Sequence, residues 1–231
     1  MPTEDRPRYE IKMVAEASQL PLVRSWLRTH PDAFRSAYPA RQVNNIYFDT
    51  PGLRHFEDNI AGISKRKKVR LRWYGPDISK IPGSTLEIKY KQNMKGWKDT
   101  RRVTAVLDLE KSKWPQLMEA IRKELDGTVA LLFGESTQPI ILNHYRREYY
   151  ISFDGQLRIT LDTKQKCLPQ WFHKNPNLAH PLPEQDQMVV ELKAGAHNGS
   201  RAHTALLAIP LRVVRHSKYV TSAEQLLALL T

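Results

Sequence analysis

The stretch Lys68-Val69-Arg70-Leu71-Arg72 alternates charged and apolar side chains. Successive side chains of a β-strand point to opposite faces of its sheet, so this pattern predicts a strand with one cationic and one apolar face. Four more segments alternate in the same way: Arg8-Tyr9-Glu10-Ile11-Lys12, Glu87-Ile88-Lys89-Tyr90-Lys91, Arg158-Ile159-Thr160-Leu161-Asp162 and Glu191-Leu192-Lys193. Any half-exposed sheet alternates, but like charges on neighbouring strands repel. The repetition therefore favours a sheet face that holds a polyanion.

Eight segments have the alternation and the β-branched and aromatic content typical of strands. They fall near residues 8–14, 43–49, 67–74, 85–91, 101–107, 139–152, 156–162 and 187–193. Asp154-Gly155 predicts a tight hairpin between two of them. Helical periodicity follows Ser18, Ser112 and Ser222, the second helix ending at Asp126-Gly127, whereas residues 169–187 and 195–200 are expected to be extended loops.

The apolar faces of these strands and helices are expected to pack against one another, because each must be buried away from water. The simplest arrangement is an α+β fold: an eight-stranded antiparallel β tunnel, that is, a closed barrel, with a charged lumen and with helices packed on the outside. Such a lumen must be wet, internally paired or occupied by an anion, because an unpaired buried charge is costly. The chain has 231 residues and shows no internal repeat or linker, so we expect a single domain over residues 1–231.

Composition narrows the function without deciding it. The formal net charge of +12 attracts anions such as nucleic acid, polyphosphate or nucleotides. The single cysteine, Cys167, excludes an internal disulfide and a cysteine-based metal site. The polar N-terminus lacks the apolar run of a secretory signal, and no stretch approaches the roughly 20 apolar residues of a membrane helix. We therefore expect a cytoplasmic protein without a transmembrane segment.

Several common catalytic motifs do not occur in the sequence. There is no P-loop, no Gly-x-Gly-x-x-Gly, no His-Glu-x-x-His and no Gly-x-Ser-x-Gly. The eight histidines also lack the spacing of metal ligands. These absences argue against the commonest nucleotide, zinc and serine-hydrolase sites, although a Ser-His-Asp triad stays open because its members need not be close in sequence.

An ordered set of short motifs spans the chain from about residue 8 to about residue 220. The motifs are Arg8-Tyr9-Glu10-Ile11-Lys12, Val69-Arg70-Leu71-Arg72, Leu86-Glu87-Ile88-Lys89, Asn143-His144-Tyr145-Arg146-Arg147, Leu157-Arg158-Ile159-Thr160-Leu161-Asp162-Thr163, Val190-Glu191-Leu192-Lys193 and His216-Ser217-Lys218-Tyr219. This set resembles the VTC-type polyphosphate polymerase domain, which belongs to the triphosphate tunnel metalloenzymes together with the CYTH phosphatases and cyclases. No single motif is specific, and the resemblance lies in their order and spacing.

The resemblance implies an enzyme that binds the triphosphate of ATP with Mn²⁺ or Mg²⁺ and transfers the γ-phosphoryl group to a growing inorganic polyphosphate chain. The catalytic residues that it implies are Lys12, Arg70, Arg72, Tyr145, Arg147, Arg158 and Lys218. Substrate binding is expected of Arg70, Arg72, Arg147 and Arg158 and, because they share the charged faces, of Glu10, Lys89, Lys91 and Lys193. Glu191 is the implied metal ligand, with Glu87 and Asp162 as alternative carboxylates.

These residue types suit phosphoryl transfer. An arginine fork pairs two phosphate oxygens at once, and Arg70 and Arg72 stand about 7 Å apart along one strand, which suits successive phosphates. Phosphoryl transfer depends on positioning and charge neutralisation more than on covalent chemistry by the protein. Carboxylates without a cysteine or histidine cluster favour a hard divalent ion.

One departure separates this chain from the CYTH triphosphatases. They begin with Glu-x-Glu-x-Lys, whereas Arg8 stands here at the position of the first glutamate. Fewer acidic ligands weaken water activation by two metals, but a polymerase attacks with a phosphate oxygen that is already anionic. The sequence therefore favours synthesis over hydrolysis.

Two alternatives to the polymerase stay open. The first is a tunnel triphosphatase that hydrolyses inorganic or nucleoside triphosphate, and the second is a non-catalytic polyanion-binding module. We expect no nucleic-acid partner, because the charged faces lack the aromatic platform on which bases stack. Single residues also have structural alternatives: an ion pair with Lys193 or Lys89 for Glu191, and a place in a general basic patch for Lys218.

Overall fold

Residues that alternate between charged and apolar build the main sheet. The computed structural model describes residues 8–93, 95–207, 209 and 211–230. The long strands are β1 (Arg8–Glu16), β2 (Arg35–Asp49), β3 (Lys65–Tyr74), β5 (Ser84–Gln92), β6 (Lys95–Val103), β8 (Gln138–Ile151), β9 (Leu157–Pro169) and β10 (Gln187–Gly195). Each overlaps one of the eight predicted strands, which confirms them. Two short strands, β4 (Lys80–Ile81) and β7 (Leu107–Asp108), pair separately.

The hydrogen-bonded order of the main sheet is β1-β10-β9-β8-β2-β3-β5-β6. The pairs β1/β10, β10/β9, β2/β3, β3/β5 and β5/β6 are all antiparallel. The α+β class with a large antiparallel sheet is thereby confirmed. The predicted closure is not: among the described strands, hydrogen bonding leaves β1 and β6 as two edges and does not join them into a barrel.

The chain divides into two units. Among the described residues, the first unit draws on the ranges 8–41, 145–165 and 185–216, and the second on the ranges 42–144, 166–184 and 217–230. The strands β2, β8 and β9 contribute residues to both units. The single-domain organisation over residues 1–231 stays a prediction.

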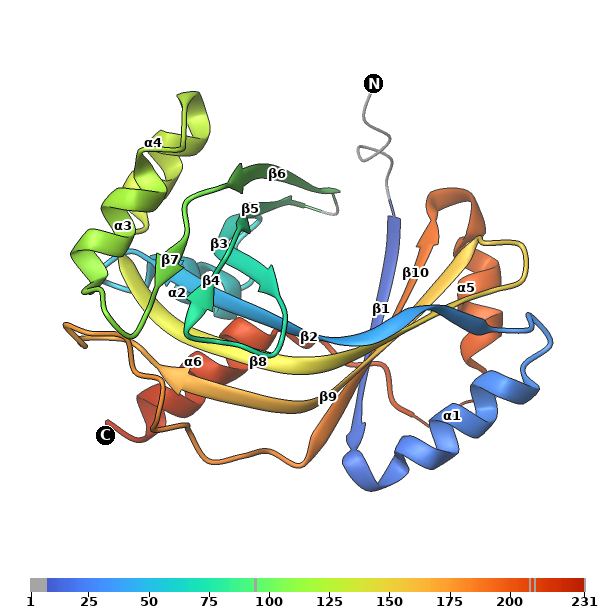
Figure 1. Cartoon of the computed structure of the whole chain (residues 1–231). Helices are drawn as coiled ribbons and strands as arrows, with labels where there is room; N and C mark the ends of the chain where they lie inside the picture. The colour runs from blue at the N-terminus through green and yellow to red at the C-terminus, as the bar shows by residue number, and fades with distance from the viewer. Residues whose placement is uncertain (1–7, 94, 208, 210, 231) are drawn as a thin grey trace. The chain divides into compact units, whose positions relative to one another are not determined.

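In the first unit, two helices cover the apolar sides of β1, β9 and β10 (Figure 1). Val23, Trp26 and Leu27 form a buried stripe on α1 (Leu20–Thr29), at the spacing of an amphipathic helix. The short helix η1 (Ala17–Gln19) precedes α1, and η2 (Ala196–Asn198) precedes α5 (Gly199–Leu206), which adds Ala202 and Ala205 to the same core. The apolar positions of the alternating strands are thus buried, as predicted.

In the second unit, the apolar side of β3 and β5 packs against α3 (Trp114–Arg122) and α4 (Gly127–Glu135), shown in green in Figure 1. Leu71 and Ile88 on the strands are fully buried, as is Phe133 of α4. A separate apolar cluster holds α6 (Lys218–Ala228) through Tyr219, which stacks on Tyr47 of β2 at 5.2 Å between ring centroids.

The predicted helices after Ser18 and Ser112 correspond to α1 and α3. The C-terminal helix begins earlier than predicted, at Lys218, because the Ser217 side chain caps it by accepting a hydrogen bond from the Val220 amide. Residues 170–186 contain no helix or strand, as expected. None of the described helices has the length and apolar character needed to cross a membrane.

Three helices of the structure were not predicted: α2 (Arg54–Ile60), α4 and α5. The α4 sequence GTVALLFGE is apolar almost throughout, so it has no helical period to detect. It begins at Gly127, where a helix end was expected, because this glycine adopts a positive φ of 52° that reverses the chain after α3. The helix α5 replaces part of the loop expected at residues 195–200.

Truncating a core leucine should destabilise the second unit. Leu71→Ala removes a fully buried side chain from β3, so the free energy of unfolding should fall by about 2–5 kcal/mol. The matched control is Leu131→Ala on α4, where the leucine is 74% exposed and the change should stay within about 0.5 kcal/mol. Urea unfolding followed by circular dichroism measures both, and equal losses would contradict the assigned core.

Candidate functional site

The polar side of β3 in the second unit presents two arginines that are held in place by neighbouring strands. Arg70 and Arg72 alternate with the buried Leu71, so their guanidinium groups lie on the face opposite the helices. Arg70 Nε donates to Glu87 Oε2 of β5 at 2.5 Å, and Arg72 Nε donates to Asn45 Oδ1 of β2 at 2.8 Å. Each guanidinium group is therefore held in place through its Nε atom, an arrangement that suits an arginine that binds phosphate through two nitrogen atoms.

A row of lysines crosses the same face. Lys68 of β3 lies directly opposite Lys89 of β5, and Lys89 lies opposite Lys98 of β6. All three side chains are half-buried. Like charges directly opposite one another destabilise a sheet, so this row gains stability when an anion lies over it. We call this face, with Asn45, Lys68, Arg70, Arg72, Glu87, Lys89 and Lys98, the β3–β5 charged face.

Two buried asparagines extend the β3–β5 charged face. Asn45 Nδ2 donates to Asn143 Oδ1 of β8 at 2.9 Å, and both side chains are inaccessible to solvent. Among the described residues, Asn143 Nδ2 has no hydrogen-bond partner. Because buried polar atoms of native proteins are almost always satisfied, this amide marks a place where a ligand or a bound water would accept a hydrogen bond.

Glu87 is the acidic residue among these cations. Burial alone would raise its pKa, but the charges of Arg70 and Arg72 outweigh burial and lower the pKa of Glu87 to about 2. The carboxylate is therefore ionised at any physiological pH and neutralises part of the positive charge of Arg70. This pairing gives Glu87 a structural role that competes with the metal-binding role considered for it.

The beginning of α6 lies beside the lysine row. Ser217 Oγ accepts a hydrogen bond from Lys68 Nζ at 2.7 Å, and the next residue is Lys218, the first of the helix. The buried Asp49 fixes this helix, because its Oδ2 accepts a hydrogen bond from the Tyr219 hydroxyl. Burial and the Asp49 charge raise the pKa of Tyr219, so the hydroxyl keeps its proton.

The polar side of β9 and β10 in the first unit carries a second charged set. Arg147 of β8 donates through Nε and Nη2 to the two carboxylate oxygens of Asp162, at 2.6 Å and 2.7 Å. Its Nη2 also lies 3.9 Å from Glu191 Oε2, and its guanidinium lies 5.3 Å from the centre of the Tyr145 ring. Burial alone would lower the pKa of Arg147, but the attraction of Asp162 raises it well above the ordinary value.

Glu191 lies at the centre of this set. Its Oε1 is 3.1 Å from Lys193 Nζ. Lys12 Nζ contacts Glu10 Oε1 at 2.8 Å and donates to the His216 carbonyl at 3.3 Å. Burial alone would raise the pKa of Glu191, but Lys193 and Lys12 lead the groups that hold it well below its usual range. The β9–β10 charged face comprises Glu10, Lys12, Tyr145, Arg147, Arg158, Thr160, Asp162, Glu191 and Lys193.

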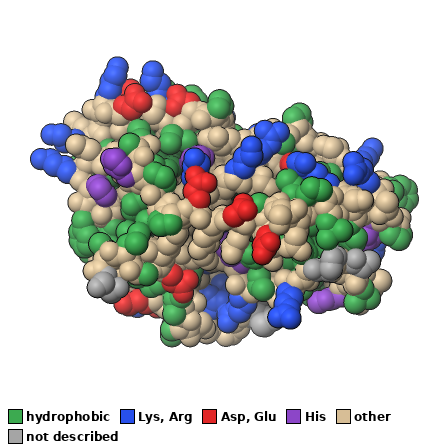
Figure 2. All heavy atoms as spheres, turned by 90° about the horizontal axis from the view of Figure 1, so that it is seen from below, with side chains coloured by type: hydrophobic (Ala, Val, Ile, Leu, Met, Phe, Trp, Pro, Cys, Tyr) green, Lys and Arg blue, Asp and Glu red, His purple; other side chains and the backbone are tan. Residues whose placement is uncertain are grey.

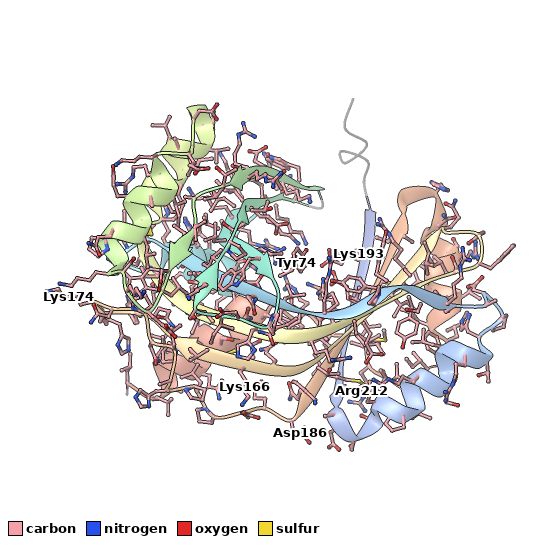
Figure 3. The ribbon with its side chains drawn as sticks, viewed as in Figure 1. Tyr74, Lys166, Lys174, Asp186, Lys193 and Arg212 are labelled. Carbon is pink, nitrogen blue, oxygen red and sulfur yellow. The ribbon has the colours of Figure 1, made fainter. Side chains whose placement is uncertain are left out.

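Figure 3 labels Lys193 on β10 and Tyr74 at the end of β3. The exposed Arg158 of β9 lies opposite Lys193 in the strand register. Lys91 is exposed near the end of β5, opposite Arg66 of β3 and beyond the lysine row. Figure 2 shows one face of the molecule, on which lysine and arginine side chains lie among acidic and apolar side chains.

The carboxylates offer one set that suits a divalent ion. Glu87 and Asp162 are each hydrogen-bonded to an arginine, whereas Glu191 is ion-paired with Lys193 and Glu10 with Lys12. Mg²⁺ is usually held by one or two carboxylates together with substrate phosphates and water, so Glu191 and Glu10 are the carboxylates of this face that could hold such an ion. No group of three histidine, cysteine, aspartate or glutamate side chains gathers for a metal within the described residues.

Several residues of these faces were not singled out in the sequence as site residues. They are Asn45, Lys68, Lys98, Asn143, Thr160 and Ser217. Lys68 could have been found, because it lies two positions before Arg70 and shares its side of the strand. Asn45 carries no charge and falls within a nearly continuous buried run, so no sequence signal marks it, whereas Asn143 is the first residue of the motif that continues with Tyr145 and Arg147. Thr160 Oγ1, like Asn143 Nδ2, has no hydrogen-bond partner among the described residues.

The lowered pKa of Glu87 predicts an acid-dependent loss of stability. A carboxyl whose folded-state pKa lies below its unfolded value stabilises the fold above the unfolded pKa, and this contribution disappears as pH falls toward the folded value. The free energy of unfolding should therefore fall between about pH 5 and pH 2. Glu87→Gln should flatten this dependence, and the exposed control Glu110→Gln should leave it unchanged, as measured by urea unfolding across pH. Identical pH profiles for all three proteins would refute the pairing.

Comparison with known proteins agrees with this geometry. The solved structure of a candidate adenylate cyclase from Vibrio parahaemolyticus superposes with a TM-score of 0.53 at 12% identity, covering 96% of this chain and 99% of the other. That likeness concerns the fold alone. A chain of the Mediator head module of Schizosaccharomyces pombe reaches a TM-score of only 0.37 at 11% identity, covering 96% of this chain and 94% of the other, too low to indicate a shared fold.

No curated protein sequence matches the chain significantly. The model of the VTC domain family, in contrast, matches residues 7–227. This range includes both charged faces and the six α-helices of the described structure, except for Ala228, the last residue of α6. A match over nearly the whole chain establishes the family, and with the cyclase fold it supports a domain of the triphosphate-tunnel type. The chain belongs to the VTC domain family.

Proposed function

We propose that this chain is a metal-dependent polyphosphate polymerase that transfers the γ-phosphoryl group of ATP to a growing inorganic polyphosphate chain. The observation that supports this proposal most directly is the lysine row of the β3–β5 charged face, Lys68, Lys89 and Lys98, beside Arg70 and Arg72. Stacking five cations on three adjacent strands around the single carboxylate of Glu87 favours a ligand with several negative charges in a line.

The β3–β5 charged face suits a phosphate chain better than a compact anion. Arg70 and Arg72 are two residues apart on one strand, and Lys68 continues the same line by two more residues. Side chains at this spacing lie about 7 Å apart, so the three cations extend along roughly 14 Å of one direction. The unpartnered Asn143 Nδ2 adds an uncharged donor beside the arginines.

The proposed phosphoryl transfer needs no covalent intermediate with the protein. A terminal oxygen of the polyphosphate forms a bond to the γ-phosphorus, and the bond from that phosphorus to the β–γ bridging oxygen breaks, so that ADP leaves with the electron pair. The attacking oxygen is already anionic, and no general base is needed. Arg70, Arg72 and Lys218 of the second unit are proposed to bind phosphate oxygens, and so are Arg147, Arg158 and Lys12 of the first unit, with Tyr145 supporting Arg147.

Substrate contacts are proposed for Lys89, Lys91 and Lys193 as well, and Glu10 orients Lys12. Of the three carboxylates considered as metal ligands, we favour Glu191, assisted by Glu10, over the arginine-paired Glu87 and Asp162. A bound Mn²⁺ or Mg²⁺ would supply Lewis-acid stabilisation of the phosphate oxygens. The closed tunnel, the single domain and a cytoplasmic location also stay predictions.

The products of ATP decide among the three functions. Pure protein incubated with ATP and Mn²⁺ should give a ladder of products on a gel stained for polyphosphate, together with ADP. Release of free phosphate without polymer would instead identify a triphosphatase, and unchanged ATP would leave only a polyanion-binding module. Omitting the metal should abolish the ladder, and Mg²⁺ in place of Mn²⁺ tests the preference for the ion.

Replacing Glu191 should abolish the metal-dependent reaction. Glu191→Gln keeps the size of the side chain but removes the charge that would hold the ion, so turnover should fall at least roughly 100-fold. The control Glu184→Gln changes an exposed glutamate that pairs with Lys166, and it should retain turnover. Normal Mn²⁺-dependent turnover of the Glu191 variant would refute the metal assignment.

Replacing Arg72 should weaken binding of the phosphate chain. Arg72→Gln removes one charged fork, and loss of charge-assisted hydrogen bonds worth about 1.5–3 kcal/mol corresponds to a roughly 10- to 100-fold lower kcat/KM. The matched control is Arg101→Gln on β6, because Arg101 points to the opposite side of the sheet and pairs with Asp126. Steady-state kinetics with ATP measure both variants, and equal effects would contradict the assigned face.

A further inference from the structure

A pocket of about 500 Å³ lies in the second unit at the end of β3 and β5 that is remote from Tyr74, the residue labelled in Figure 3. Residues from α2, β3, β5, β6 and α4 line it. Its volume falls within the range of small-molecule sites. The proposed polymerase chemistry does not use this pocket, apart from Lys91, which also lines it.

One wall of the pocket is aromatic. Tyr90 of β5 and Trp97 of β6 stack with their ring centroids 5.3 Å apart and their planes inclined by 16°. Trp97 remains 41% exposed, whereas Trp26, Trp73 and Trp114 are buried. The half-buried Leu132 of α4 adds an apolar contact. An exposed ring backed by a second ring offers a surface on which a planar group can stack.

The rest of the lining is mainly cationic. The lining includes two acids, Asp58 and Glu135, and three more cations than acids. The cations are Arg54, Lys65, Arg66, Lys67 and Lys91. Two of these cations are committed within the protein: Lys67 Nζ contacts Glu135 Oε2 at 2.5 Å, and Arg66 Nη1 donates to the Ile63 carbonyl at 2.7 Å.

Two of the remaining cations are available for an anion. Arg54 and Lys65 are both exposed, and among the described residues neither has an ion-pair partner. The hydrogen bond from Lys67 lowers the pKa of Glu135, so this acid stays ionised and bound to its lysine. Arg54 and Lys65 therefore remain available for contact with an incoming anion.

The pocket lies at the end of the strands and is lined from both sides of the sheet. Lys65, Lys67 and Tyr90 alternate along their strands with Lys68 and Lys89, so they point to the side that carries the apolar core, whereas Arg66 and Lys91 share the side of the lysine row. The pocket differs chemically from the β3–β5 charged face, because it has an aromatic wall beside its cations.

We infer that this pocket binds a nucleoside 5′-phosphate, with the base stacked on Trp97 and the phosphate held by Arg54 and Lys65. A linear phosphate chain would gain nothing from the Tyr90–Trp97 wall, and an uncharged aromatic ligand would gain nothing from the two cations. Only a ligand with both a planar ring and a phosphate uses all of these groups. The inference does not depend on the polymerase proposal.

Binding of AMP to the full chain tests the inference. Isothermal titration calorimetry, with tryptophan fluorescence as a second readout, should detect AMP in the unmodified protein. Trp97→Leu and Arg54→Gln should each weaken AMP binding at least about 10-fold, because one removes the stacking surface and the other a phosphate contact. The matched controls, Phe153→Leu and Arg212→Gln, change an exposed aromatic and an exposed arginine in the first unit and should bind AMP normally.

Two further binding experiments test which part of the ligand is recognised and whether it binds in this pocket. Inorganic tripolyphosphate, which lacks a base, should bind equally well to the unmodified protein and to Trp97→Leu. Arg72→Gln, toward the end of β3 that is remote from the pocket, should leave AMP binding unchanged. Absence of AMP binding, full binding by Trp97→Leu, or loss of AMP binding in Arg72→Gln would each overturn the inference. Tripolyphosphate competing with AMP in a manner that requires Arg54 but not Trp97 would assign the pocket to a phosphate chain instead.

Discussion

Repulsion between cations on adjacent strands is the constraint around which this protein is built. Lys68, Lys89 and Lys98 lie directly opposite one another across three strands, and Arg70 and Arg72 follow Lys68 along β3. The other side of the sheet buries a continuous apolar core under α3 and α4, which stabilises the strands that carry these cations.

The acids limit that repulsion without removing it. Glu87 pairs with Arg70 and Asp162 pairs with Arg147, each through short hydrogen bonds, and for Glu87 burial alone would raise the pKa of the carboxyl. These pairs hold their arginines in defined orientations, which is how a fork becomes selective for phosphate geometry. Glu191 differs, because its shortest ion pair is with Lys193 and not with an arginine.

The two sides of β3 and β5 support different kinds of recognition. On the polar side, charge repeats every two residues, which matches a repeating ligand. At one end of the other side, Trp97 and Tyr90 combine with Arg54 and Lys65, which matches a ligand with two unlike parts.

The sequence by itself determined the local, periodic features. The alternation in Lys68–Arg72 and Glu87–Lys91 was enough to predict both strands and the side on which their charges lie, because a strand's faces follow from a period of two. The ordered motifs were enough to identify the family. The helix α4 escaped prediction because an apolar segment without a period does not distinguish a helix from a strand. Only the tertiary structure decided which carboxylate pairs with which arginine, that Asn45 and Asn143 are hydrogen-bonded, and that Trp97 and Arg54 line one pocket, because these arrangements join residues far apart in the chain and leave no local trace.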